Sequence, residues 1–258
     1  MISKKNKNII LIPARLNSSR LAQKLLLKID GKSIIQHTYE NSKKSKYASK
    51  TLILVDSIKL LKFCKNFTDD VILTSANHKS GTERIVEFLK VNKTFENIVN
   101  VQGDEPFISP TLIDNLFKEL ENDEGIVTYG YHADLKQNEN STNEVKIVLD
   151  KNSYAIYFSR SPIPFNRDET SKSKKLIHIG LYGYKRNELT LFDSYKNNKL
   201  EKIEKLEQLR FIENRRNILV LKTEKKTIGI DTKNDFEDAI KYYFKKKSKS
   251  SFDRNSQK

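Results

Sequence analysis

Four short apolar runs in the first half of the chain constrain its fold more than any other feature. The runs are residues 8–13, 51–55, 71–74 and 97–101, and Ile, Leu and Val dominate them. They are continuous rather than alternating, which is typical of strands buried on both faces of a sheet. Residues with helical spacing fill the intervals, and Ser109-Pro110 introduces one well-patterned helix. This alternation predicts an α/β fold with a mostly parallel, doubly wound sheet.

The second half of the chain has a different pattern. Strand-like runs follow one another with fewer helices between them, which predicts a mixed C-terminal extension of the sheet. A helix rich in Glu and Lys is expected over 199–216, and a last helix over 234–244 after Asp231-Thr232. The predicted strands of this half are residues 125–133, 145–149, 154–159, 176–184 and 218–223.

Both ends of the chain are basic and lack this pattern. Residues 1–8 contain three lysines and no acid, and residues 245–258 contain five lysines and one arginine against one aspartate. We therefore expect a basic N-terminal extension over 1–8, a single domain over 9–244 and a disordered basic tail over 245–258.

Composition excludes several classes of protein. The one cysteine, Cys64, excludes an intramolecular disulfide and a cysteine-rich zinc site. No apolar run approaches the length of a membrane span, and the first residues lack the apolar centre of a signal peptide. We expect a protein of the reducing cytoplasm that has no membrane partner, with Cys64 inert in the core.

The net charge of +15 raises the alternative of a nucleic-acid-binding protein. Much of the excess lies in the two ends, and no RNA-binding signature with stacking aromatic residues is present. Anionic small substrates suit the same sign of charge. We therefore expect no nucleic-acid partner.

The loop after the first strand is the first candidate site, because ligands of an open parallel sheet bind outside the carboxyl ends of its strands. It combines small and hydroxyl residues, among them Ser18, with three cations, Arg15, Arg20 and Lys24. Backbone N–H groups and hydroxyls of such a loop suit polyphosphate oxygens, whose charge the cations neutralise. The loop is neither a Walker A loop nor a GxGxxG turn. A solvated basic loop is the alternative interpretation.

Two carboxylates are candidates for a metal site. Asp104 follows the fourth strand, in the segment 102–106, and would face the basic loop. Mg²⁺ takes one or two carboxylates together with phosphate oxygens. Asp231 follows a later extended run and is the candidate for the second ligand. The alternatives are turn chemistry for Asp104 and an N-cap of the last helix for Asp231.

The remaining candidates have ordinary structural explanations beside the functional one. Ser80-Gly81-Thr82 opens a helix, which suits capping or an oxygen contact at a helix N-terminus. Glu207 stands three residues before Arg210, where an ion pair within one helix is the ordinary explanation. Isolated side chains such as His178 and Tyr182 are more often structural than catalytic.

Eight motifs, taken in order, resemble the 3-deoxy-D-manno-octulosonate (Kdo) cytidylyltransferases, also called CMP-Kdo synthetases. The resemblance runs from about residue 9 to residue 243. It implies a nucleotide-diphospho-sugar-transferase-like fold, a homodimer, and transfer of CMP from CTP to Kdo with release of pyrophosphate, for lipopolysaccharide or capsule synthesis. The motifs are IPARxxSxRLxxK, SGTER, NVQGDEP, VKxVLD, YFSRSPIP, HIGLYGY, LEQLR and IDT.

The same resemblance implies roles for individual residues. It makes Asp104, Lys24 and Arg15 catalytic, and it assigns Asp104 and Asp231 to Mg²⁺, the implied cofactor. The residues implied for CTP are Arg15, Ser18, Arg20, Lys24, Ser80, Gly81 and Thr82. Those implied for the sugar acid are Gln102, Arg160, His178, Tyr182 and Glu207.

One departure from the family pattern lies in the basic loop. The family reads Arg-Leu-Pro-Gly-Lys where this chain has Arg20-Leu21-Ala22-Gln23-Lys24. If the glycine has a positive φ, either Gln23 is strained or the loop changes shape, and the triphosphate geometry depends on which. The altered loop raises the alternative of a relative that binds without catalysis. A cytidylyltransferase for 8-amino-Kdo or a nonulosonic acid, and the nucleic-acid-binding protein suggested by the charge, are the other two alternatives to Kdo transfer.

Overall fold

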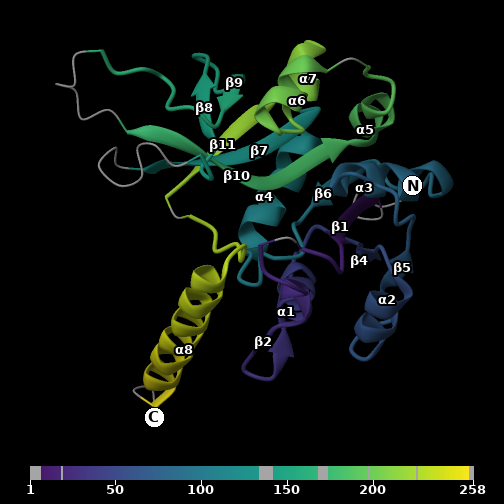
Figure 1. The fold of residues 1–258 in the computed structure, drawn as a ribbon, viewed down its shortest axis with the longest axis vertical. Coiled ribbons are helices and arrows are strands. Elements are labelled where there is room, and N and C mark those ends of the chain that lie inside the picture. Colours follow the sequence, from purple (N-terminus) through teal and green to yellow (C-terminus); the bar gives the residue numbers. More distant parts are fainter. Residues whose placement is uncertain are drawn as a thin grey trace.

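The computed structural model describes residues 7–18, 20–133, 142–167, 174–196, 198–224 and 226–255, with side chains through residue 248. Its centre is a nine-stranded sheet in which the strands β11-β7-β10-β6-β1-β4-β5 lie in that order (Figure 1). No helix within these ranges is long and apolar enough to cross a bilayer.

The N-terminal half of the sheet is parallel, as predicted. β1 (Asn8–Ala14) pairs with β4 (Lys50–Val55) on one side and β6 (Asn97–Asn100) on the other, and β4 pairs with β5 (Val71–Leu73). Every residue of β1 and β6 is buried, because helices cover both faces of these strands. The continuous apolar runs of the sequence are therefore the interior strands of the sheet.

The C-terminal half is the predicted mixed extension. β10 (Lys175–Lys185) lies between β6 and β7 (Ile126–Ala133) and runs antiparallel to both. β11 (Leu219–Thr223) is parallel to β7 at the edge. β8 (Lys146–Leu149) and β9 (Ala155–Ser159) form a hairpin outside this strand order, and β8 pairs with β10.

Two apolar cores lie on opposite faces of the sheet, which makes the fold doubly wound. Cys64 is fully buried in one of them, and this burial raises the pKa of its thiol to about 12, so the thiol is inert as predicted. The helices of that face are α1 (Ile34–Ser42), α2 (Ile58–Lys65), α4 (Pro110–Glu121) and the start of α8 (Lys233–Asn255), and those of the other are α3 (Gly81–Val91), α5 (Arg186–Phe192) and α7 (Leu209–Glu213).

The prediction of one helix over 199–216 is wrong. The chain instead forms α6 (Lys199–Glu204) and then α7, because Lys205 adopts a left-handed backbone (φ 55°) that ends the first helix. Arg210 pairs with Glu201 across this break, with two nitrogen–oxygen distances of 2.7 Å. The alternative explanation of Glu207, an ion pair with Arg210, is therefore wrong.

The last helix is longer than predicted. α8 (Lys233–Asn255) continues past residue 244, so the segment expected to be disordered from Lys245 is helical through Asn255. Figure 1 shows α8 in yellow, projecting from the body of the molecule. Asp30, in the turn between β2 (Lys28–Ile29) and β3 (Lys32–Ser33), accepts hydrogen bonds from Tyr243 and Lys247. Residues 1–6 and 256–258 lie outside the described residues.

Candidate active site

A cavity of about 450 Å³ opens at the carboxyl ends of β1 and β6. It lies where an open parallel sheet is expected to bind its ligand. Nine of the predicted site residues line it together with Arg84, Glu105 and the exposed Lys79. The nine are Arg15, Ser18, Lys24, Ser80, Gly81, Gln102, Asp104, Glu207 and Asp231.

The basic loop has Ala22-Gln23 in place of the Pro-Gly of the family pattern. Gln23 adopts the left-handed conformation itself, with φ 48° and ψ 34°, directly before the 3-10 helix Lys24–Leu26. The loop is also held by its own contacts: the Asp56 carboxylate accepts from the Leu16 N–H at 3.0 Å, and the Ser18 hydroxyl donates to the Leu21 carbonyl. Gln23 therefore has the positive φ considered for the family's glycine, with the cost that a left-handed backbone imposes on a residue with a side chain.

Asp104 and Asp231 converge on one cation, the Lys24 ammonium. Lys24 Nζ contacts Asp104 Oδ2 and lies 2.7 Å from Asp231 Oδ1, and Arg20 Nη2 lies 2.9 Å from Asp231 Oδ2. Burial would lower the pKa of Lys24, but the charges and hydrogen bonds of the two aspartates outweigh it and raise that pKa. For Asp231 burial acts in the opposite sense, and the two cations outweigh it and lower the pKa of its carboxyl.

The Asp231 side chain can contact Lys24 and Arg20 because Thr232 and Asp235, not Asp231, cap the last helix. The Thr232 hydroxyl accepts from the Asp235 N–H at 3.2 Å, and the Asp235 carboxylate accepts from the Thr232 N–H at 2.8 Å. This reciprocal pair is a capping box. The predicted alternative of Asp231 as the N-cap is therefore wrong, and the stretch before it, expected to be a strand, is irregular.

The N-terminus of α3 forms one wall of the cavity. Ser80 is the N-cap, and its hydroxyl accepts from the Glu83 N–H at 3.2 Å, so the capping alternative is correct for this residue. Gly81 packs closely on the first loop, since a Cβ at this position would lie 3.0 Å from Pro13 Cγ. The unpaired N–H groups of this first turn suit phosphate or carbonyl oxygens.

Comparisons with known proteins agree on the family to which this chain belongs. A family model described as cytidylyltransferase matches residues 9–222. A 3-deoxy-manno-octulosonate cytidylyltransferase of Chloroherpeton thalassium is 40% identical over 89% of this chain and 94% of its own length. One of Fusobacterium nucleatum is also 40% identical, over 90% and 95%. This chain belongs to the 3-deoxy-manno-octulosonate cytidylyltransferase family.

Solved structures give the same fold. A CMP-2-keto-3-deoxy-manno-octonic acid synthetase complexed with CTP is 32% identical and superposes with a TM-score of 0.88, over 93% of this chain and 99% of its own. A cytidylyltransferase from Leptospira borgpetersenii has a TM-score of 0.60 at 17% identity, over 91% of this chain and 85% of its own, which supports the fold alone.

Arg84 lines the cavity, although the sequence analysis did not single it out. Its side chain is 4% exposed and lines the cavity from α3, one turn after Ser80. Nη1 donates to Thr74 Oγ1 and to the Ser75 carbonyl at 3.1 Å. Burial lowers the pKa of this guanidinium, although the charges of Asp56 and Glu87 oppose the shift. The spacing of four residues from Ser80 is the signal that would have placed it on this wall.

Glu105 is a second residue that the sequence analysis missed. One carboxylate oxygen accepts from the Thr227 hydroxyl at 3.1 Å, and the other is buried without a partner. Burial, reinforced by the charge of Asp104, raises the pKa of Glu105 to about 7. Within the described ranges, no group of three or more His, Cys, Asp or Glu side chains is arranged to hold a metal ion by itself.

The predicted sugar contacts are only partly gathered at the cavity. Gln102 and Glu207 line it, and burial raises the pKa of Glu207 against hydrogen bonds with Thr82 and Ser80. His178 and Tyr182 are not among the residues that line the cavity, and their rings contact each other at a tilt of 54° with centroids 5.2 Å apart.

Arg160 also lies away from the cavity. Its Nε donates to the Glu204 carbonyl at 2.8 Å and its Nη1 donates to the Thr142 carbonyl at 2.8 Å. These neutral acceptors leave the guanidinium charge without a carboxylate partner in the contacts that the structure gives for it.

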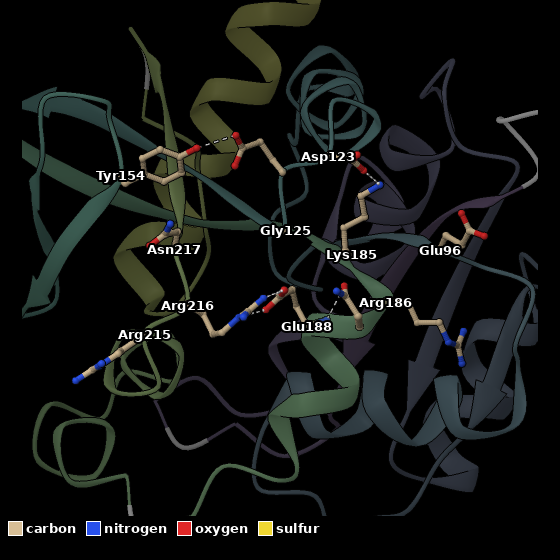
Figure 2. Close-up of a pocket in the computed structure, with 12 residues that line it drawn as sticks. Glu96, Asp123, Gly125, Tyr154, Lys185, Arg186, Glu188, Arg215, Arg216 and Asn217 are labelled. Atoms are coloured by element: carbon tan, nitrogen blue, oxygen red, sulfur yellow. Dashed lines mark hydrogen bonds and ion pairs between the residues drawn. The ribbon is translucent and has the colours of Figure 1, made fainter.

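A larger hollow of about 730 Å³ lies at the opposite ends of the strands, next to the starts of β6, β7 and β11, and Figure 2 shows its lining. Its charges are largely paired with one another. Arg216 Nε lies 2.8 Å from Glu188 Oε2, Lys185 lies 3.3 Å from Asp123, and the Tyr154 hydroxyl donates to Glu124 at 2.8 Å. Since it lacks both the basic loop and the carboxylate pair, this hollow is not the candidate active site.

Proposed function

We propose that this chain transfers CMP from CTP to Kdo and releases pyrophosphate. The observation that carries the proposal is the basic loop facing two carboxylates in a cavity at the sheet edge, in a chain that covers almost the full length of relatives named 3-deoxy-manno-octulosonate cytidylyltransferase. The activated sugar acid would serve lipopolysaccharide or capsule synthesis. A cytoplasmic location suits a chain whose one cysteine is buried and unpaired.

The basic loop and the α3 N-terminus would bind the CTP triphosphate. The C2 hydroxyl of Kdo would attack the α-phosphorus in line and lose its proton to solvent, while the bond between the α-phosphorus and the bridging oxygen breaks and pyrophosphate leaves. Arg15, Arg20 and Lys24 would neutralise the charge that builds on the leaving group. The protein contributes mainly alignment and charge stabilisation in such a transfer.

Asp104 and Asp231 would hold Mg²⁺. Their fit to the ion is supported by the shared cation in this structure, since both carboxylates already converge on one ammonium group. Mg²⁺ is usually bound by one or two carboxylates, and phosphate oxygens and water molecules supply its other ligands. When bound, the ion would stabilise charge on the phosphate oxygens and lower the pKa of the attacking hydroxyl.

Gln102 and Glu207, which line the cavity, would contact the sugar acid. Arg160 would supply a bidentate partner for the sugar carboxylate only after it leaves the carbonyl oxygens that it now contacts. His178 and Tyr182 would likewise have to turn toward the cavity.

We also propose that the chain forms a homodimer. Large apolar side chains are exposed at Ile156 on β9 (55%), at Phe165 in the segment after it (82%) and at Ile203 on α6 (77%). The Ser159 hydroxyl donates to Glu204 at 2.6 Å and joins the ends of β9 and α6. Exposed apolar groups of this kind are typical of an interaction surface. Light scattering on the purified chain should give a mass of two chains, which Ile203→Glu should reduce.

Pyrophosphate release from CTP and Kdo with Mg²⁺ tests the proposed reaction. We expect release that requires all three, and a lower kcat/KM with 8-amino-Kdo and nonulosonic acids in place of Kdo. Faster turnover of one of those acids would reassign the substrate. CTP binding without turnover of any acid would support a relative that only binds, and RNA retained at physiological salt would support a nucleic-acid-binding protein.

A further inference from the structure

The Lys24 side chain occupies the space between the two carboxylates proposed for the metal. Its ammonium contacts Asp104 and lies 2.7 Å from Asp231, while only 14% of the side chain is exposed. Asp104 and Asp231 come from distant parts of the chain, and two bare carboxylates this close would repel each other. The ammonium therefore holds the pair together when no other cation is present.

We propose that the Lys24 ammonium takes the place of the divalent cation between Asp104 and Asp231 and competes with the metal for them. The metal displaces Lys24 only when the nucleotide binds. The inference rests on the proposed function, because it takes the carboxylate pair as the metal site. It makes Lys24 a positioning residue in the empty enzyme and a phosphate ligand in the loaded one.

The competition follows from the contacts. The ammonium uses Asp104 Oδ2 and Asp231 Oδ1, one oxygen from each carboxylate, and those oxygens face a common point. A divalent ion ligated by both aspartates requires the same point, so Lys24 has to leave. Leaving costs two charge-assisted contacts in a partly buried site, where such contacts are stronger than in water.

CTP removes this cost by offering Lys24 another partner. The triphosphate brings several anionic oxygens to the loop that carries Lys24, so the ammonium exchanges carboxylate for phosphate as the metal enters. Arg20 is released in the same way, since the ion pair that it forms within the described residues is with Asp231, at 2.9 Å. Metal and nucleotide should therefore favour each other's binding by the same factor.

The decisive measurement is Mn²⁺ binding to the nucleotide-free full chain, followed by electron paramagnetic resonance. We expect weak binding to the wild type and on the order of tenfold tighter binding to Lys24→Met, because the competing cation is gone. Lys24→Arg keeps a cation and should bind as weakly as the wild type. Lys79→Met is the matched control, since it removes an exposed lysine from the same cavity that has no contact with either aspartate, and it should change the Mn²⁺ affinity less than about threefold.

Equal Mn²⁺ affinities for the wild type, Lys24→Met and Lys79→Met would overturn the inference. Thermal unfolding gives a second readout if Lys24→Met is destabilised: Mn²⁺ should raise its midpoint more than that of the wild type, and equal rises would count against the competition.

The proposed metal site is tested separately by Mn²⁺ binding in the presence of a non-hydrolysable CTP analogue. Asp104→Asn should weaken that binding, and no weakening would reject the carboxylate pair as the metal site. If Asp104→Asn weakens it while Lys24→Met binds no better than the wild type without nucleotide, only the competition fails.

Discussion

The Ile230 N–H donates a hydrogen bond to the Asp104 carbonyl oxygen, at 3.0 Å. This bond fastens the irregular segment before α8 to the end of β6, and it brings Asp231 beside Asp104 although the two lie far apart in sequence. Ile230 is fully buried, so the contact is held by the core rather than by the surface. The carboxylate pair is therefore part of the folded framework.

Asp104→Asn should lower pyrophosphate release at least about a hundredfold, because it removes a charge proposed to hold the metal and the leaving phosphates. Steady-state assays at several Mg²⁺ concentrations would measure it. Asp114→Asn is a matched control, since Asp114 contacts Ser45 and Lys46 outside the cavity, and it should keep wild-type turnover. Wild-type turnover in Asp104→Asn would remove Asp104 from the site.

Gln23→Gly should stabilise the protein by about 1 kcal/mol, because glycine adopts a left-handed backbone without the cost that a side chain imposes. Urea unfolding of the two proteins would measure the difference. Gln23→Ala keeps the strained Cβ and should show no such gain. A loss of stability in Gln23→Gly would mean that Gln23 is not strained.

Arg84 lines the cavity from α3, whose N-terminus is proposed to bind the triphosphate. Arg84→Met should therefore raise the KM for CTP about ten- to hundredfold, the usual cost of losing a hydrogen bond from a charged donor. The KM for Kdo should change much less. Arg215→Met removes an exposed arginine from the other hollow and should leave both constants unchanged. If Arg84→Met shifts the two KM values equally, Arg84 supports the fold rather than the nucleotide.

His178 should make the protein less stable in acid. Burial lowers the pKa of its imidazole from 6.5 to about 3. Between pH 6.5 and pH 3, this imidazole is therefore protonated in the unfolded chain and neutral in the folded chain. The free energy of unfolding should therefore fall as the pH drops below 6.5, by up to about 1.4 kcal/mol per pH unit. Urea unfolding between pH 7 and pH 5 would measure this slope, which His178→Gln should reduce. Identical slopes would contradict the shift.

Removal of residues 245–258 should leave turnover unchanged. Of the deleted contacts, the ion pair of Lys247 with Asp30 lies at the surface and away from the cavity. Activity and thermal midpoint of a chain that ends at Phe244 would test this. A large fall in kcat would mean that the end of α8 reaches the active site.

The parallel half of the sheet was predictable because burial on both faces leaves a continuous apolar run in the sequence. The break at Lys205 was not predictable, since a lysine in the left-handed conformation carries no local signal. The extension of α8 was missed for a related reason: its last turns are rich in lysine and lack an apolar face, and only helix propensity continues through them.

Lys24 and Asp104 were predictable as site residues because both lie in loops that directly follow predicted buried strands. Capping was ambiguous because Asp231 and Thr232 both favour an N-cap, and only the geometry assigns that role to Thr232. Arg84 was overlooked because an arginine within a helix is ordinarily a surface residue.

Strand β10 has a consequence for how the chain matures on the ribosome. It lies between β6 and β7 and is made some fifty residues after β7 begins. β7 therefore cannot join the N-terminal half of the sheet through β10 until residue 185 has emerged. Until then the nascent chain must carry an open edge at β6, the position at which a chaperone or a misdirected partner strand would act.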